Sequence, residues 1–186
     1  MYPDAYLCQL AEIFNGISVN TPSLSAIIAI ILAGLLLLAS GFASASEIAF
    51  FSLSPSDLID IEEGNHPSDG KISNLLADSE RLLATILITN NFVNVTIIML
   101  CNFFFMNVFV FHSPLAEFLI LTVILTFLLL LFGEIMPKIY SAQKTLAFCR
   151  FSAPVIYVLR KVFAPISAVL VHSTAYLHKH FANKKQ

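Results

Sequence analysis

Charged residues are scarce in this sequence, and tryptophan is absent. Asp, Glu, Lys and Arg make up 12% of the 186 residues and hydrophobic residues 58%, whereas soluble domains carry about 25% charged residues. A net charge of −2 and the lack of a basic patch with interleaved aromatic residues argue against a nucleic-acid partner. The three cysteines, Cys8, Cys101 and Cys149, are too widely spaced for a zinc site or a disulfide framework. The composition therefore predicts an integral membrane protein embedded in a lipid bilayer.

Sequence patterns of hydrolytic enzymes are missing as well. The chain contains no HExxH or GxSxG motif and no convincing nucleophile–base pair, so we do not expect an enzyme. The N-terminal segment has no Lys or Arg before its apolar run, which argues against a cleaved signal peptide.

Three long apolar segments predict three transmembrane helices in an all-α membrane protein. About 20 apolar residues cross the ~30 Å hydrocarbon core as a helix, and we expect spans at about 24–53, 82–112 and 115–137. Between the first two spans, residues 54–80 are polar and acidic and contain a turn signal at 66–70, so they predict short cytoplasmic helices. The expected fold is a single transmembrane domain over residues 1–186.

Residues 142–183 are harder to assign to the bilayer. Pro154 and Pro165 are expected to interrupt any continuous helix. A fourth span would also place Lys179, Lys184 and Lys185 outside, against the positive-inside rule. We therefore predict juxtamembrane amphipathic helices that lie in the inner interface, and keep a fourth span as the alternative.

The distribution of basic residues predicts the orientation. None of the ten Lys and Arg lies in residues 1–25 or in the turn at 112–117. Because cytoplasmic loops are enriched in Lys and Arg, we expect the N-terminus outside, the C-terminus in the cytoplasm, and a location in the cell (inner) membrane.

Glu134 is the most informative residue. It is a lone carboxylate at the end of an apolar run, and an ionised carboxylate in a membrane costs roughly 2.5–3.5 kcal/mol on insertion scales. Pro137 has no N–H, so an α-helical hydrogen bond to the carbonyl of Gly133 is lost. A carboxylate and a freed carbonyl are therefore expected side by side at membrane depth, as the start of a cation site.

Two other spans offer oxygen ligands at a similar depth. Asn90 and Asn94 are four residues apart and share one helix face, and the first span contributes Ser40 and Ser44. Hard oxygen ligands suit Mg²⁺, Ca²⁺, Na⁺ or Mn²⁺ rather than copper or zinc. The alternative interpretation is that the asparagines are interhelical glue and the Ser/Gly/Ala stretch of the first span is a close-packing surface.

At these residues the chain resembles the transmembrane domain of the CorC / cyclin M (CNNM) family of magnesium transporters. Residues 42–49 (FASASEIA) are similar to the family pattern F-S-x-S-E-T-A, with Ala43 and Ile48 as departures, and residues 90–94 (NNFVN) to G-N-x-x-V-N, with Thr89 in place of Gly. Residues 133–138 (GEIMPK) match G-E-x-x-P-K fully. Gliding-motility and hemolysin-like membrane proteins of the same superfamily are the nearest rival.

The resemblance implies a function and a ligand set. Family members export Mg²⁺, and some also Co²⁺, in exchange for Na⁺, and they work as homodimers. Their metal is held without its water shell by residues matching a set of five, supported here by Ser40 and Pro137. The five are Ser44, Asn90, Asn94, Gly133 and Glu134.

The family also implies domains that residues 1–186 do not include. Its members continue into a pair of CBS nucleotide-binding modules and a small C-terminal domain, so a cytoplasmic CBS module is an expected partner in a longer protein. Two functions remain open from the sequence. One is a divalent-cation transporter that works by alternating access; the other is a non-transporting membrane anchor of a motility or secretion machine.

Overall fold

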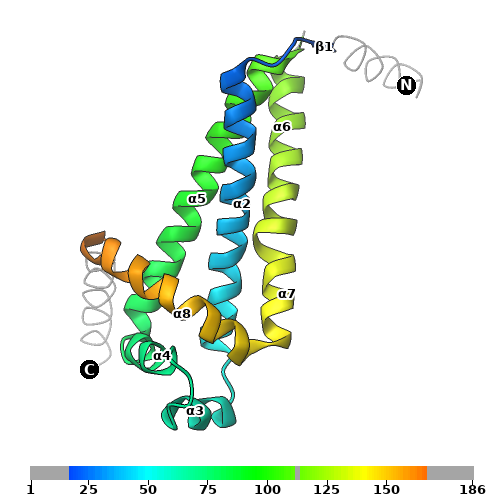
Figure 1. Cartoon of the computed structure of the whole chain (residues 1–186). Coiled ribbons are helices and arrows are strands. Elements are labelled where there is room, and N and C mark those ends of the chain that lie inside the picture. The colour runs from blue at the N-terminus through cyan, green and yellow to red at the C-terminus, as the bar shows by residue number, and fades with distance from the viewer. Residues whose placement is uncertain (1–16, 112–113, 167–186) are drawn as a thin grey trace, which may run out of the picture.

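Three long helices form the body of the protein. The structure, a computed structural model, describes residues 17–111 and 114–166. Helix α2 (Leu24–Phe51) lies between α5 (Ser79–Val108) and a third rod made of α6 (Pro114–Leu128), the π-helix η1 (Leu129–Ile135) and α7 (Met136–Gln143) (Figure 1). Within the described residues three helices are long and apolar enough to cross a membrane: Leu24–Phe51, Ser79–Val108 and Glu117–Gln143. The predicted all-α membrane fold with three spans is confirmed.

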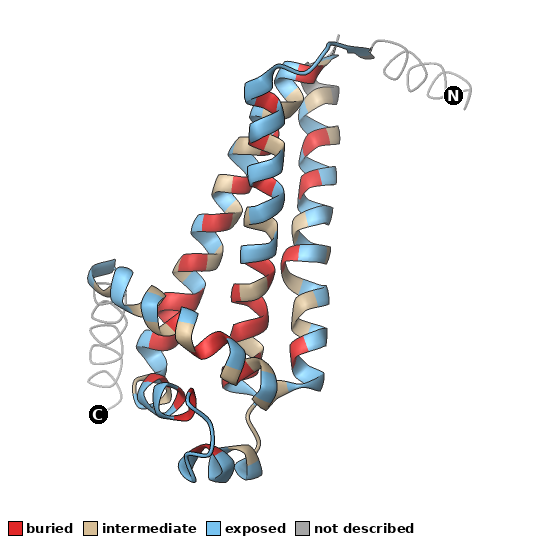
Figure 2. Ribbon diagram, in the orientation of Figure 1, coloured by how far each residue is buried: buried red, intermediate tan, exposed pale blue. Residues whose placement is uncertain are grey.

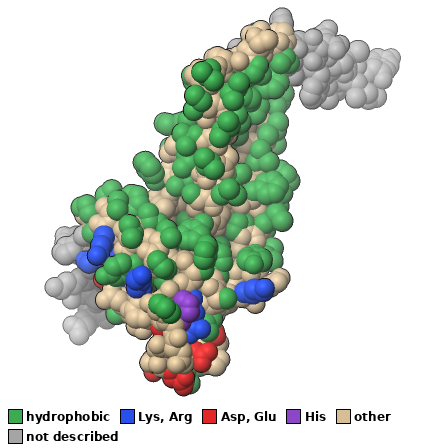
Figure 3. All heavy atoms as spheres, viewed as in Figure 1, with side chains coloured by type: hydrophobic (Ala, Val, Ile, Leu, Met, Phe, Trp, Pro, Cys, Tyr) green, Lys and Arg blue, Asp and Glu red, His purple; other side chains and the backbone are tan. Residues whose placement is uncertain are grey.

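Burial follows narrow stripes along the upper parts of the long helices and is denser at the lower end of the molecule, where the largest hydrophobic core lies (Figure 2). Most large apolar side chains point outward; Leu38 is 72% exposed and Met99 68%. Figure 3 shows this apolar surface over the bundle, with charged side chains gathered at its lower end. Because an apolar exterior of this extent suits hydrocarbon rather than water, the distribution agrees with a membrane protein.

Helix α2 begins after Ser23, which caps it by accepting a hydrogen bond from the Ala26 N–H at 3.2 Å. Small residues let the helix pack closely against its neighbours in its second half. Beyond Ala39 the helix is rich in Ala, Ser and Gly, and most of these residues are buried. In membranes such residues allow backbones to approach, since there is little bulk between the helices. This half of α2 contacts both α5 and the third rod.

Two short helices follow α2, as the sequence predicted. Helix α3 (Pro55–Glu62) begins with a capping box in which Ser54 and Asp57 exchange hydrogen bonds, and Gly64 takes a positive φ of 69° after its end. Helix α4 (Asp69–Leu76) follows and packs on α8 (Thr145–Val162).

Helix α8 crosses the lower end of the bundle (Figure 1). The prediction that Pro154 interrupts this segment is wrong: the proline lies inside a continuous helix. Proline removes one hydrogen bond and strains one turn, and burial of Cys149, Ala153 and Ile156 against the core holds the helix through it. The helix ends at Val162, before Pro165, and positions 167–183 of the predicted juxtamembrane segment lie outside the described residues.

The second span ends earlier than predicted. Helix α5 stops at Val108, and Phe109–Phe111 forms strand β2, which pairs antiparallel with β1 (Ile17–Val19). Val and Phe favour extended structure once a partner strand is present. The pairing of residues far apart in sequence explains why helical periodicity alone did not reveal it.

Candidate metal centre

Ser40 is the centre of a polar cluster between α2 and α5. Its hydroxyl lies 2.9 Å from Asn90 Oδ1 and 2.6 Å from Asn94 Oδ1. The Ser44 hydroxyl, one turn further along α2, lies 3.4 Å from the same Asn90 oxygen. Both serines are fully buried. Four of the side chains singled out from the sequence therefore meet at one place.

The cluster contains more oxygen contacts than hydrogens to fill them. The two hydroxyl groups supply one hydrogen each, while three oxygen–oxygen contacts join them to the two amide oxygens. The single Ser40 hydrogen is therefore shared between the two amide oxygens, and lone pairs remain on all four oxygen atoms. Hydroxyl and amide oxygens are hard ligands of the kind that Mg²⁺ and similar ions take.

The third rod approaches this cluster through glycine. A Cβ built on Gly133 would lie 3.1 Å from Ser40 Oγ, and one built on Gly41 would lie 2.9 Å from Pro137 Cγ and 3.2 Å from the carbonyl oxygen of Phe132. Because neither glycine has a side chain, the backbones of α2 and η1 can come this close. The structure thus brings Gly133 against the Ser40 cluster.

The backbone hydrogen-bond register changes in η1. The Met136 N–H donates to the carbonyl of Leu131, five residues back, as in a π-helix. Pro137 follows in the first turn of α7 and has no N–H to donate. In an α-helical register the lost bond is the one to the carbonyl of Gly133, and the freeing of that carbonyl stays a prediction. In the π register the carbonyl five residues before the proline is that of Phe132. Such π turns occur frequently at functional sites.

Glu134 follows Gly133 and is half-buried. Among the described residues its carboxyl group makes no hydrogen bond and no ion pair. The nearest cation along the chain, Lys138, pairs instead with Glu47 on α2 at 3.0 Å. No hydrogen bond joins the carboxylate to the Ser40 cluster. Within the described part of the chain this carboxyl group has no charged partner.

Two features of this centre were not apparent from the sequence. Ser40 was expected only to support the site, yet it contacts both asparagines. Its spacing from Ser44 by one helical turn was the available signal. The Glu47–Lys138 pair joins α2 to α7 one turn beyond the cluster, and the sequence showed only that the two residues belong to separate family motifs.

Clustered carboxylates do not contribute to this centre. The described residues contain no group of three or more His, Cys, Asp or Glu that could hold a metal ion. A cation at the Ser40 cluster would therefore be surrounded mainly by neutral oxygen atoms, with Glu134 as the one charged group on the adjoining turn. Neutral oxygens with one carboxylate are compatible with a hard cation that must also be released.

A separate charged centre lies outside the spans, between α4 and α8. Asp69 is fully buried and accepts hydrogen bonds from Arg150 Nε at 2.8 Å and Nη2 at 3.1 Å, and from the His66 N–H at 2.9 Å. The Arg150 guanidinium holds the pKa of Asp69 below its usual value. Burial raises the pKa of the neighbouring Cys149 thiol to about 12, so this thiol stays protonated.

The sequence is similar to known proteins over most of its length. The family model described as the Cyclin M transmembrane N-terminal domain (CNNM) matches residues 30–186. A UPF0053 protein of Haemophilus influenzae is 32% identical over 130 residues, which cover 70% of this chain and 30% of that protein. The chain thus spans less than a third of that relative. Since the family match covers most of the chain and all of the Ser40 cluster, the chain belongs to the CNNM transmembrane domain family, a family of proteins related to Mg²⁺ transport.

Proposed function

We propose that this domain carries Mg²⁺ across the membrane through a site between α2, α5 and η1. The observation that carries the proposal is the convergence of hydroxyl and amide oxygens on Ser40, with Gly133 packed against it. The candidate ligands are five: the side chains of Ser44, Asn90, Asn94 and Glu134 and the carbonyl of Gly133.

The chemistry of these ligands fits a dehydrated divalent ion. Mg²⁺ prefers about six oxygen ligands at about 2.0–2.1 Å and gives up its water reluctantly. Five protein oxygens would replace most of the water shell, and Glu134 would supply the only negative charge. Co²⁺ also accepts oxygen ligands and is a second possible cargo.

Release requires the ligands to separate. The ligands of α2 and α5 are linked to each other by hydrogen bonds, whereas Gly133 and Glu134 belong to a helix with a π turn and a proline. Helices bend readily at π turns and at prolines. We propose that movement of η1 and α7 against α2 opens the site to one side at a time, with export of Mg²⁺ in exchange for Na⁺ and the N-terminus outside.

We also propose that the domain works as a homodimer through the groove between α5 and α6. This groove has a volume of about 400 Å³ and is lined mainly by apolar residues. Three exposed polar side chains in it, Asn102, Thr122 and Thr126, make no hydrogen bond within the described residues. Lipid cannot satisfy these groups, whereas a second copy of the chain can. Cross-linking through Thr122→Cys is expected, and cross-linking through Leu38→Cys on the outer face of α2 is not.

The proposed function is tested by Mg²⁺ binding to the purified domain. Calorimetry should show binding to the wild type and much weaker binding to Glu134→Gln. Mg²⁺ should also protect the wild type, but not this variant, from heat. Equal Mg²⁺ affinity in the two proteins would reject the transport site, and the absence of any Mg²⁺ effect would favour a membrane anchor.

A further inference from the structure

A polar cavity, separate from the proposed metal centre, lies where α4, α5 and α8 meet. It has a volume of about 350 Å³, and none of its lining residues belongs to the proposed metal centre. Three of its lining residues carry positive charge and one carries negative charge. The lining residues are Asn74, Asp78, Arg81, Arg160, Lys161 and Ala164.

Two of the three cations are held in place by neighbours that do not cancel their charge. Arg160 donates from Nη1 to the carbonyl oxygen of Asn74 at 3.0 Å and from Nη2 to the side-chain oxygen of the same residue. Its guanidinium carbon lies 5.4 Å from the centre of the Tyr157 ring, and Lys161 Nζ lies 4.8 Å from it. A neutral amide and an aromatic ring orient both groups and leave their charge available to an anion.

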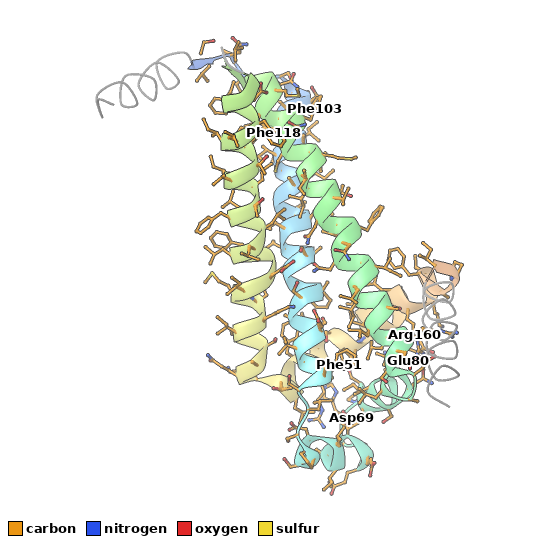
Figure 4. All side chains as sticks on the ribbon, turned by 180° about the vertical axis from the view of Figure 1, so that it is seen from behind. Phe51, Asp69, Glu80, Phe103, Phe118 and Arg160 are labelled. Carbon is orange, nitrogen blue, oxygen red and sulfur yellow. The ribbon has the colours of Figure 1, made fainter. Side chains whose placement is uncertain are left out.

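Asp78 is the one acid among the described residues that line the cavity, and it does not neutralise the three cations. Asp78 lies 3.6 Å from Arg81 Nε, and both side chains are almost half exposed. Such a pair is weak in contact with solvent. Glu80 lies nearby on α5, as Figure 4 shows, but does not line the cavity. Three positive charges against one negative charge leave an excess of two positive charges.

The cavity lies at a boundary between apolar and polar surface. Arg81 is in the first turn of the span α5. On α8, Val155, Val158 and Val162 are spaced by three and four residues, so they share one face, and they are 46%, 57% and 62% exposed. A helix with an exposed apolar face and cations beside it is suited to the interface between headgroups and acyl chains.

We propose that this cavity binds the phosphate headgroup of an anionic phospholipid. Arg and Lys are the usual donors to phosphate, and a basic pocket next to a membrane helix is a recognised form of lipid headgroup site. The exposed valines lie on the face of α8 turned away from Arg160 and Ala164, so they would contact the surrounding bilayer and hold the helix in the interface. The position of Arg81 in the first turn of a membrane span favours a lipid headgroup over free phosphate, and the excess positive charge favours an anionic lipid over a zwitterionic one.

The test compares the full chain in two membranes. The wild type is reconstituted into nanodiscs of phosphatidylcholine alone or with phosphatidylglycerol, and bound lipids are counted by native mass spectrometry after gentle release. The variant is Arg81→Gln combined with Lys161→Gln, which leaves the Arg160–Asn74 contacts in place. The matched control is Lys144→Gln, which removes an exposed cation outside the cavity. Circular dichroism and gel filtration confirm that each variant is folded.

The wild type and Lys144→Gln should retain phosphatidylglycerol, and the double variant should retain it about thirtyfold less, since two interfacial cations together contribute about 2 kcal/mol. Competition by inorganic phosphate at millimolar concentration would show a free-phosphate site and overturn the proposal. An equal loss of phosphatidylglycerol in Lys144→Gln would indicate binding by diffuse surface charge and would also overturn the proposal. Unchanged retention of phosphatidylglycerol in the double variant would overturn it as well. None of these outcomes depends on Mg²⁺ binding, so the proposal stands or fails apart from the transport function.

Discussion

The two most informative carboxylates of this protein are held in opposite ways. Asp69 is fully buried and is bonded to Arg150 and to the His66 N–H, at the junction of α4 and α8. Glu134 is half-buried in a membrane span and has no hydrogen bond or ion pair within the described residues. A buried charge with a partner from the same chain holds helices together. One without such a partner is available to a cation from outside the chain.

The neutral groups around the two carboxylates reinforce this difference. Around Asp69 the bonds run from donors to acceptors, and each carboxylate oxygen receives at least one hydrogen. Around Ser40, three oxygen–oxygen contacts share two hydroxyl hydrogens. The donors saturate the first arrangement, and we propose that a cation uses the lone pairs left in the second.

Glu134→Gln should weaken Mg²⁺ binding more than any other single change. The substitution keeps the shape and removes the only charge, so we expect a loss of at least about tenfold, which corresponds to about 1.4 kcal/mol. Titration calorimetry measures it. Asp69→Asn is the matched control, because it removes a carboxylate of the paired kind and should leave the Mg²⁺ affinity unchanged. A loss of Mg²⁺ affinity of the same size in both variants would show that the unpaired carboxyl group of Glu134 has no special role in binding.

Asp69→Asn should instead lower thermal stability. It leaves Arg150 without its carboxylate partner at the α4–α8 junction, and breaking a buried pair on one side is strongly destabilising. The Tm of the purified domain should fall by several degrees, whereas Asp60→Asn, on the exposed face of α3, should change it little. An unchanged Tm in Asp69→Asn would show that the pair does not stabilise the fold.

Gly41→Ala should disturb the metal centre through the backbone. The added methyl group would meet Pro137 at 2.9 Å and the carbonyl of Phe132 at 3.2 Å, so α2 and η1 must separate. Gly34→Ala on the same helix meets nothing within 4 Å, and in an exposed helix position it should be neutral or stabilising by up to about 1 kcal/mol. The measurement is the Mg²⁺ affinity and the Tm of the two variants. If Gly41→Ala and Gly34→Ala have the same Mg²⁺ affinity and the same Tm, α2 and η1 are not closely packed at Gly41.

Ser40→Ala should reduce Mg²⁺ affinity less than Glu134→Gln but measurably, by about threefold to tenfold. It removes the hydroxyl that lies between Asn90 and Asn94, and a neutral hydrogen bond is worth about 0.5–1.5 kcal/mol. Ser46→Ala is the control, because that buried hydroxyl donates only to the carbonyl of Phe42 in its own helix. If both variants bind Mg²⁺ alike, Ser40 serves packing alone.

The contribution of Asp69 to stability should depend on pH in a defined direction. Its pKa is lowered by Arg150 in the folded protein, so its stabilisation is fully present above the unfolded pKa of about 3.9 and is lost as the pH falls through the lower folded value. The Tm difference between wild type and Asp69→Asn should be constant from pH 7 to about 4 and shrink below it. A difference that shrinks near pH 6 would point to a histidine instead.

Much of the architecture could be predicted because composition reflects the solvent. Long apolar runs with few charges identify the three spans whatever their neighbours are. The sequence could not indicate the β1–β2 pair or the continuity of α8 through Pro154, since both depend on contacts between distant segments. Pro154 illustrates the reason: local propensity disfavours the helix, and burial of its neighbours outweighs that preference.

The sequence by itself determined the membrane environment, the number of spans and the chemical kind of the candidate ligands, because these follow from residue types and their spacing along one helix. Only the tertiary structure decided that Ser40 joins both asparagines, that Glu47 takes Lys138 as its partner, and that η1 leaves the α-helical register. Each of these features depends on which side chains of different helices meet. Glycine and serine determine how closely two helix backbones approach, and the pattern of residues along one helix does not reveal that distance.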